Sequence, residues 1–328
     1  MTPVRFGGAA LRAEAIPLGA ILTRVELADG RGGWVNVTLG RPAPADYAAP
    51  HPNFGAVVGR FANRIAGARF ALDGLEHRIT ANEAANCLHG GHGFARRMWR
   101  PAAHAPDRAA FDLTSPDGED GFPGTVELRV TYTTEGATLR VAFEGAADAP
   151  TLLSPAQHAY WNLGGEASGS ALGHELLIEA ERYTPVGEGL IPTGELAPVA
   201  GTPFDFRTAR RIGERMEEAH PQLILGGGYD HNWVLRGTGF RRAARLHDAA
   251  SGRAMEVWTD RPGLQFYAGC RLDGTLAGSS GAAYARGAGL ALETQSFPDG
   301  PNQPGFPSGI LRPGERFHSI TEYRFEVG

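Results

Sequence analysis

Two segments of this chain alternate apolar and polar residues with a period of two, and this alternation constrains the fold more than any other feature of the sequence. They are residues 126–133 (VELRVTYT) and 138–143 (TLRVAF). Successive side chains of a β-strand point to opposite faces, so such a segment buries one face and leaves the other in solvent. Both segments are therefore predicted to be half-buried strands.

Further segments with strand character follow along the chain, separated by turns rich in glycine and proline. The 46 glycines and 23 prolines supply many turns but stay below the fraction typical of disordered sequences. Only residues 208–219 carry a helical pattern, with Ile212 and Met216 four residues apart. One short helix among many strands predicts an all-β sandwich or barrel. The other predicted strands are residues 33–39, 176–180, 232–235, 254–259, 264–268 and 323–327.

No shift in composition, long linker or internal repeat divides the chain, so we expect a single domain over residues 1–328. This length exceeds the roughly 200–250 residues common for one all-β domain, and some long loops are expected for that reason. The proline-containing stretch from Asp46 to Asn53 and the turn at Asp273-Gly274 are the candidates.

The chain contains no lysine. All 31 of its strongly basic residues are arginines. Schiff-base enzymes, pyridoxal phosphate enzymes and P-loop nucleotide sites need a lysine nitrogen, so these mechanisms are excluded. A net charge of -5 without any basic run argues against nucleic acid or an anionic membrane as the main partner. No stretch approaches the roughly 18 apolar residues of a membrane span.

The N-terminal residues lack the charged start, apolar core and cleavage site of a secretory signal, and cytoplasmic residence is the default expectation. The two cysteines, Cys87 and Cys270, are then expected to remain reduced.

Four polar clusters lie at the ends of apolar segments. Glu293 follows the strand-like run 290–292 and precedes a Phe-Pro-Asp-Gly turn. The other three clusters are residues 88–91 (LHGG), 157–162 (QHAYWN) and 228–232 (GYDHN). Together they hold three histidines and two carboxylates that are far apart in sequence. This distribution suggests an acid/base site assembled by folding.

Eight motifs extend almost from end to end of the chain: residues 58–65, 88–91, 117–124, 158–163, 201–206, 228–232, 264–267 and 293–295. Their order resembles that in the aldose 1-epimerases, also called galactose mutarotases. The resemblance implies a large antiparallel β-sandwich, the galactose mutarotase-like supersandwich, with a sugar cleft on one face. It also implies interconversion of the α and β anomers of a free hexose or pentose, with no cofactor and no metal.

Carried over residue by residue, the resemblance implies that Glu293 is the general base for the anomeric hydroxyl and that His158 is the acid that protonates the ring oxygen. The resemblance also implies that His89 lies close to the reacting end and contacts the substrate. These residue types suit the chemistry, since a base needs a carboxylate and an acid needs a group that titrates near neutrality. The remaining implied substrate contacts are Asn63, Arg64, Asp230 and Gln265, and Tyr160 is a candidate sugar platform.

Most of these residues have a structural interpretation as well. Glu293 could be a solvent-exposed charge at the edge of a strand. His158 could be a buried core histidine whose hydrogen bonds are satisfied by the protein. Asp230 could cap the turn that follows the glycines at 226–228, and Arg64 could be the partner of a structural ion pair. The alternation of a strand places Gln265 opposite Phe266 but does not say which of the two sides is the cleft.

Three changes from the usual family pattern are expected near the cleft and bear on substrate preference. They are Gln157, Trp161 and Cys270.

Three other functions are weighed. A metal site could use Cys87, His89, His92 and Cys270, although their spacing is not that of paired ligands. A glycoside hydrolase could use Asp230 and Glu293 as its carboxylates. A carbohydrate-binding module would need no acid/base pair, so His158 with Glu293 favours an enzyme. The expected partner is a free monosaccharide, not nucleic acid or a membrane, and the chain is expected to be a monomer or homodimer.

Overall fold

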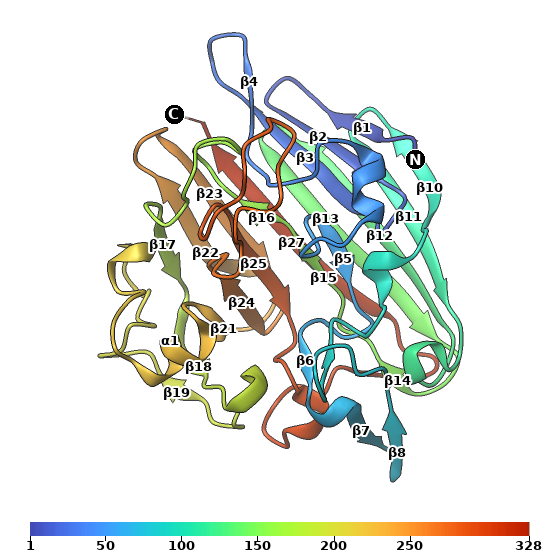
Figure 1. Ribbon diagram of the computed structural model, residues 1–328. Coiled ribbons are helices and arrows are strands. Elements are labelled where there is room, and N and C mark those ends of the chain that lie inside the picture. Colours follow the sequence, from blue (N-terminus) through green and yellow to red (C-terminus); the bar gives the residue numbers. More distant parts are fainter. Residues whose placement is uncertain (328) are drawn as a thin grey trace.

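The computed structural model describes residues 1–327, and antiparallel strands form nearly all of their regular structure (Figure 1). The largest sheet has nine strands. From one edge to the other they are β10 (Arg100–Ala105), β11 (Arg108–Ser115), β12 (Val126–Glu135), β13 (Thr138–Ala147), β27 (Phe317–Glu326), β23 (Arg253–Thr259), β22 (Arg241–Asp248), β17 (Glu175–Ile178) and β20 (Arg210–Arg211).

A six-stranded sheet packs against the nine-stranded sheet and completes a sandwich. The rings of Trp161 and Tyr323, one from each sheet, have centroids 4.6 Å apart, and the hydroxyls of Thr294 and Thr321 are hydrogen-bonded across the same interface. The six strands, in order, are β16 (Tyr160–Trp161), β25 (Leu290–Gln295), β24 (Gly263–Tyr267), β21 (Asp230–Leu235), β18 (Ala180–Thr184) and β19 (Ala197–Pro198).

Smaller sheets extend this sandwich and carry the loops that reach the site. The four-stranded sheet consists of β1 (Val4–Gly7), β2 (Leu11–Ile16), β3 (Ile21–Ala28) and β4 (Trp34–Asn36). The two-stranded sheets pair β5 (Ala56–Val58) with β15 (Ala156–His158), β6 (Arg64–Ile65) with β9 (Cys87–Leu88), β7 (Arg69–Leu72) with β8 (Leu75–Arg78), and β14 (Thr151–Leu152) with β26 (Ile310–Leu311).

The predicted alternation is confirmed in the nine-stranded sheet. In β12, Val126, Leu128 and Val130 are buried, whereas Glu127 and Arg129 are exposed. The buried side chains join an apolar core that continues into the six-stranded sheet. All the other predicted strands are present with shifted ends, and the segment 176–180 is divided, because β17 ends at Ile178 and β18 begins at Ala180.

The predicted helix over 208–219 is wrong. This segment forms the short edge strand β20 and a 3-10 turn, and β20 pairs with β17. Ile212 and Met216 are both buried as the pattern required, but a turn achieves this without an α-helix. The only α-helix of residues 1–327 is α1 (Pro221–Gly226), which follows directly.

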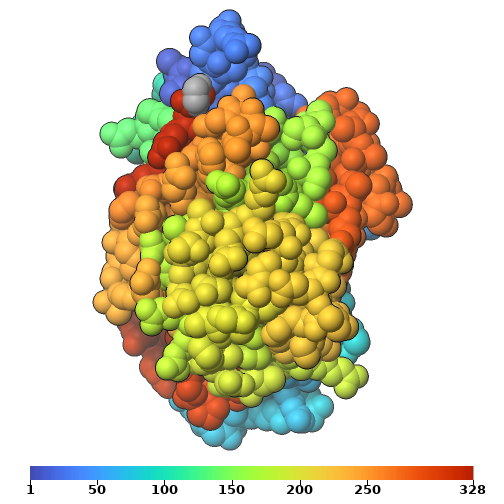
Figure 2. Space-filling view, turned by 90° about the vertical axis from the view of Figure 1, so that its left-hand side faces the viewer, coloured from blue at the N-terminus to red at the C-terminus, as the bar shows by residue number. Residues whose placement is uncertain are grey.

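Local sequence signals explain where α1 begins and ends. Pro221 occupies the first helical position, where its missing N–H costs nothing, and the His220 side chain accepts a hydrogen bond from the backbone N–H of Gln222. Gly227 ends the helix in the left-handed conformation that glycine adopts without strain. In Figure 2 the yellow segments around α1 form one side of the molecule. No helix in the described part of the chain is long and apolar enough to cross a membrane.

The remaining local structure consists of single 3-10 turns. They are η1 (Pro44–Ala48), η2 (Ala66–Ala68), η3 (Phe94–Arg96), η4 (Glu119–Gly121), η5 (Glu188–Leu190), η6 (Ile212–Glu214) and η7 (Gly300–Asn302). Both expected loops are found: the stretch from Asp46 to Asn53 contains part of η1, and Asp273-Gly274 lies in the long connection between β24 and β25.

The strand register gives the six-stranded sheet one apolar and one polar face. Leu292 pairs with Phe266, and both belong to the core between the two large sheets. Glu293 pairs with Gln265, so these two residues occupy the opposite face. All six residues of β25 are nevertheless buried, because the loops of the smaller sheets cover the polar face. The polar face is where the site forms.

Candidate active site

A hollow of about 160 Å³ opens on the polar face of the six-stranded sheet. Its lining comes from strands of this sheet and from residues in or near β6, β9 and β15. The residues around it include seven of the eight predicted site residues; the eighth, Gln265, lies beneath them. The lining residues are Pro52, Asn53, Asn63, Arg64, Leu88, His89, His158, Tyr160, Asp230, Tyr267, Arg271 and Glu293.

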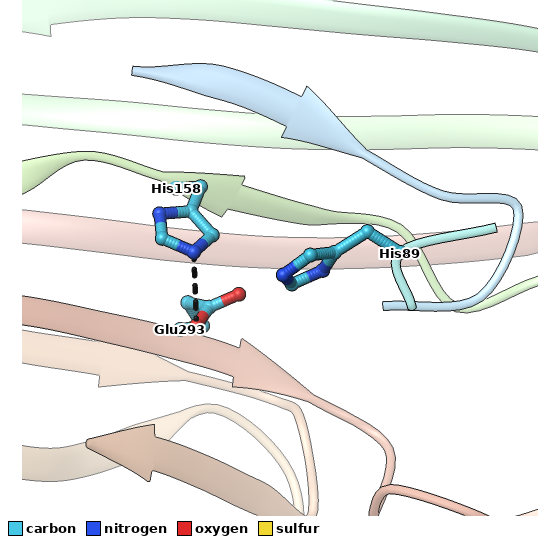
Figure 3. A group of neighbouring side chains, drawn as sticks. All are labelled: His89, His158 and Glu293. Atoms are coloured by element: carbon cyan, nitrogen blue, oxygen red, sulfur yellow. Dashed lines mark ion pairs between the residues drawn. The ribbon is translucent and has the colours of Figure 1, made fainter. Parts of the chain in front are cut away.

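His158 and Glu293 face each other in this pocket (Figure 3). The Nε2 atom of His158 at the end of β15 lies 3.5 Å from Oε1 of Glu293 on β25. This separation is slightly longer than a good hydrogen bond, and it leaves both atoms accessible to a bridging hydroxyl. Both side chains are almost fully buried. Glu293 is therefore not a solvated edge charge.

Burial shifts the pKa values of this pair in opposite directions. Desolvation, assisted by the negative charge of Asp230, raises the pKa of Glu293 to about 8. Desolvation lowers the pKa of His158 to about 4. Between these values the pair holds one proton, which rests on the carboxyl group. Its transfer to Nε2 produces a carboxylate and an imidazolium, the forms of a base and an acid, without any change in proton count.

His89 is the third member of this group. It follows β9 with a φ of 54°, and its ring meets that of His158 edge to face with centroids 5.2 Å apart. The Nδ1 atom accepts a hydrogen bond of 3.1 Å from the backbone N–H of Asn63. Burial holds the pKa of His89 well below its usual value. The neutral ring therefore carries its proton on Nε2 and is a hydrogen-bond donor.

Arg64 belongs to both an ion pair and the pocket. Its guanidinium donates two hydrogen bonds to Glu83, of 2.6 and 2.9 Å. A third nitrogen, Nη1, lies 3.8 Å from Oδ2 of Asp230 and faces the pocket. The Asn63 side-chain oxygen accepts a hydrogen bond from the Arg64 backbone N–H. Glu83 thus fixes the guanidinium plane and leaves one edge for a ligand.

Asp230 begins β21 and is held from below by Gln265. The Gln265 amide donates a 2.7 Å hydrogen bond to Oδ1 of Asp230. The side on which Gln265 lies is thereby decided: Phe266 points into the core and Gln265 points toward the site. Gln265 does not line the hollow itself, and its bond to Asp230 orients that carboxylate.

Tyr160 lies on β16 beside the reacting pair. Its ring is 5.1 Å from the His158 ring and makes an edge contact with Tyr267 at 6.0 Å. Tyr267 was not among the predicted site residues, although it stands two residues after Gln265 on the same face of β24. The other lining residues that were not predicted lie at the end of β9, in the case of Leu88, and otherwise in loops. They are Pro52, Asn53, Leu88 and Arg271.

None of the three departures from the family pattern lines the pocket itself, although Gln157 directly precedes His158 and Cys270 directly precedes Arg271. Trp161 points to the other face of β16 and packs against Tyr323 in the core, with the two rings tilted by 45°. Gln157 donates to the Gly55 carbonyl and accepts from the Ala159 N–H, which makes it a buried structural residue. The Cys270 sulfur lies 3.9 Å from the Tyr229 carbonyl.

A metal ion would have one candidate location in the described part of the chain. Ligand atoms of His89, His158 and Glu293 lie within 4.8 Å of one another. The set does not suit a metal, because the Asn63 N–H occupies Nδ1 of His89 and leaves a proton on Nε2 where a lone pair is needed. Cys87, His92 and Cys270 do not join this group, and both cysteines are free.

A wide antiparallel β-sandwich that presents a buried carboxylate beside two imidazoles in a polar pocket has the features of an acid/base enzyme. Comparisons with known proteins name the family. A family model described as aldose 1-epimerase matches residues 4–324. Galactose mutarotase of Homo sapiens is 44% identical over 319 residues, which cover 97% of this chain and 92% of the relative.

Two further comparisons agree. Aldose 1-epimerase of Escherichia coli K12 is 37% identical over 313 residues, covering 94% of this chain and 90% of the relative. A solved structure of a GalM/aldose epimerase homologue from C. elegans superposes with a TM-score of 0.90 at 29% identity, covering 99% of each chain. The chain belongs to the aldose 1-epimerase family, and the predicted supersandwich fold is confirmed.

Proposed function

We propose that this protein is an aldose 1-epimerase that interconverts the α and β anomers of free aldoses such as galactose, glucose or a pentose. The observation that carries the proposal is the buried His158–Glu293 pair, with 3.5 Å between Nε2 and Oε1. One proton shared between a carboxyl group and an imidazole provides a base and an acid in one place.

Ring opening uses both members of the pair. Glu293 takes the proton of the anomeric hydroxyl, C1 becomes a carbonyl carbon, and the bond between C1 and the ring oxygen breaks. His158 gives its proton to the ring oxygen as that bond breaks. The electrons of the broken bond remain on the oxygen, so the open aldehyde form is neutral.

Reclosure reverses these transfers. Rotation about the C1–C2 bond exposes the other face of the aldehyde, the ring hydroxyl attacks it, and Glu293 returns a proton to the new anomeric oxygen. His158 recovers the proton of the ring hydroxyl. The pair ends in its starting state, so the reaction consumes no cofactor.

The other residues of the pocket hold the sugar. His89, as a fixed neutral donor, binds an oxygen at the reacting end. Arg64, Asn63 and Asp230 supply donors and acceptors for the remaining hydroxyls, and Tyr160 offers a ring face. The support for these roles is their placement around one hollow.

The test is anomer exchange. The wild-type protein should accelerate equilibration of freshly dissolved α-galactose or α-glucose, measured by polarimetry or NMR, and leave alkyl and aryl glycosides intact. Glu293→Gln keeps the size of the side chain but cannot accept the proton, so it should lose the acceleration and retain sugar binding by calorimetry. Release of sugar from a glycoside would indicate a hydrolase, and binding without acceleration would indicate a binding module.

The hydrolase alternative is not favoured. Asp230, its second carboxylate, accepts from Gln265 and faces Arg64, an arrangement suited to holding a hydroxyl. We also propose a single domain over residues 1–328, supported by a core that includes both Phe6 and Phe325. Cytoplasmic residence, supported by the free Cys87 and Cys270, and a monomeric or homodimeric state belong to the proposal.

A further inference from the structure

A row of buried amides lies beside Glu293 on the polar face of the six-stranded sheet. Gln265 pairs with Glu293 on one side and with Asn232 on the other, so the three side chains project from the same face. Directly paired residues have Cβ atoms about 4.5–5.5 Å apart. Gln295 stands two residues beyond Glu293 on β25 and shares this face.

A glycine brings the far end of this row together. Gly263 is the direct partner of Gln295 and contributes no side chain. A Cβ atom at position 263 would lie 2.3 Å from Oδ1 of Asn232. The Asn232 amide therefore lies over Gly263, on the side of Gln295, which only a glycine permits.

The polar atoms of these side chains are not satisfied by protein groups. All four residues are 2% exposed or less. Among residues 1–327, no hydrogen-bond partner exists for Oε2 of Glu293, Oε1 of Gln265, or either amide atom of Asn232 and Gln295. Leaving so many buried polar atoms unbonded is unfavourable. Buried water that makes two to four hydrogen bonds is the usual solution.

We infer that Gln265, Asn232 and Gln295 hold ordered water behind Glu293, and that this water donates a hydrogen bond to Oε2 when the carboxylate is ionised. The inference rests on the proposed role of Glu293 as the base. Amide groups both donate and accept, so they can orient water toward a carboxylate. Asn232 and Gln295 act through the water and are positioning residues.

The surroundings of Glu293 show why such water would matter. Arg64 contributes a positive charge that favours the ionised form, and Asp230 opposes it. A hydrogen bond from water stabilises the carboxylate and lowers the pKa of Glu293 from the value that burial alone sets. The ionisable groups that face Glu293 from the elements around it are His158, His89, Arg64, Asp230, Tyr160 and, across the sheet, Tyr323.

Substitution of the amides tests the inference. Gln295→Met and Asn232→Leu keep the approximate volume and remove the hydrogen bonds to water. We expect kcat to fall about tenfold with KM unchanged, and the high-pH limb of the rate profile to move up by about one unit, because a less hydrated carboxylate keeps its proton. Leu292→Met, on the core face of the same strand, is the matched control and should move neither quantity.

Two further measurements separate the outcomes. A high-resolution crystal structure of the wild-type protein should show water within hydrogen-bond distance of Oε2 of Glu293 and of the amides. Tm should fall in both variants if the water is present. The inference is overturned if the crystal structure shows no water between Oε2 of Glu293 and the amides. It is also overturned if Gln295→Met and Asn232→Leu raise Tm and leave the pH profile unchanged, even when the wild-type enzyme is active. An inactive wild-type protein would instead refute the proposed function.

Discussion

The Nε2 atom of His158 lies 3.5 Å from Oε1 of Glu293, although the two residues belong to different sheets. His158 ends β15, which pairs only with β5, whereas Glu293 lies within the six-stranded sheet. Two residues after His158, β16 pairs with β25, and the same antiparallel register continued backward brings His158 beside Glu293. Their contact is therefore a product of pairing between strands far apart in sequence, and the chemistry of the site depends on that contact.

Replacement of His158 by asparagine should remove the proton donor and leave the fold intact. We expect His158→Asn to lose about 10²-fold or more in kcat, the usual contribution of one general acid, with an unchanged circular dichroism spectrum. His92→Asn is the control, because the His92 side chain is 84% exposed and lies outside the pocket. A folded His158→Asn variant with the wild-type rate would remove His158 from the mechanism.

The dependence of kcat/KM on pH should be bell-shaped. Below about pH 4 the pair gains a second proton and Glu293 cannot act as a base, since the pKa of His158 is about 4. The upper limb falls at or below about pH 8, where the pair loses its single proton and no acid remains, since burial raises the pKa of Glu293 to about 8. The test is to measure kcat/KM across this pH range and to subtract the rate of uncatalysed mutarotation at each pH. A profile that rises steadily with pH would contradict it.

Glu293→Gln should stabilise the protein most at high pH. Burial raises the pKa of Glu293 in the folded chain from 4.5 to about 8, so the folded state holds an extra proton between these values. The stability present below pH 4.5 is lost as the pH rises through 8. Glutamine does not ionise and avoids this loss, which amounts to at most a few kcal/mol.

Calorimetric Tm values of the two proteins measure this effect. The difference between Glu293→Gln and wild type should be small near pH 4.5 and should increase toward pH 8. A difference that is the same at both ends of this range would show that the carboxyl group is not desolvated in the folded protein.

Removal of metal should leave activity unchanged. The Asn63 N–H bonds to Nδ1 of His89, which places the ring proton on the atom that a metal would need. Dialysis against a strong chelator, followed by measurement of the mutarotation rate, tests the point. A loss of rate that zinc restores would support a metal site at His89, His158 and Glu293.

Much of the architecture could be predicted because it depends on local patterns. The alternation in residues 126–133 and 138–143 indicated the buried faces of β12 and β13, since a strand side chain has only two directions to take. The residue types of the site were also predictable, because histidine and carboxylate clusters at strand ends suit acid/base chemistry, and the family resemblance assigned a role to each of them.

The sequence by itself determined which segments become strands and which chemical groups are available, through alternation and side-chain type. Only the tertiary structure decided how those groups are used. Pairing between distant strands turned Gln265 toward Asp230 and Trp161 into the core, and sheet contacts formed a turn from residues 208–219 despite their helical pattern. Burial then gave Glu293 and His158 their shifted pKa values, because desolvation depends on every element that covers a side chain and not on its neighbours in sequence.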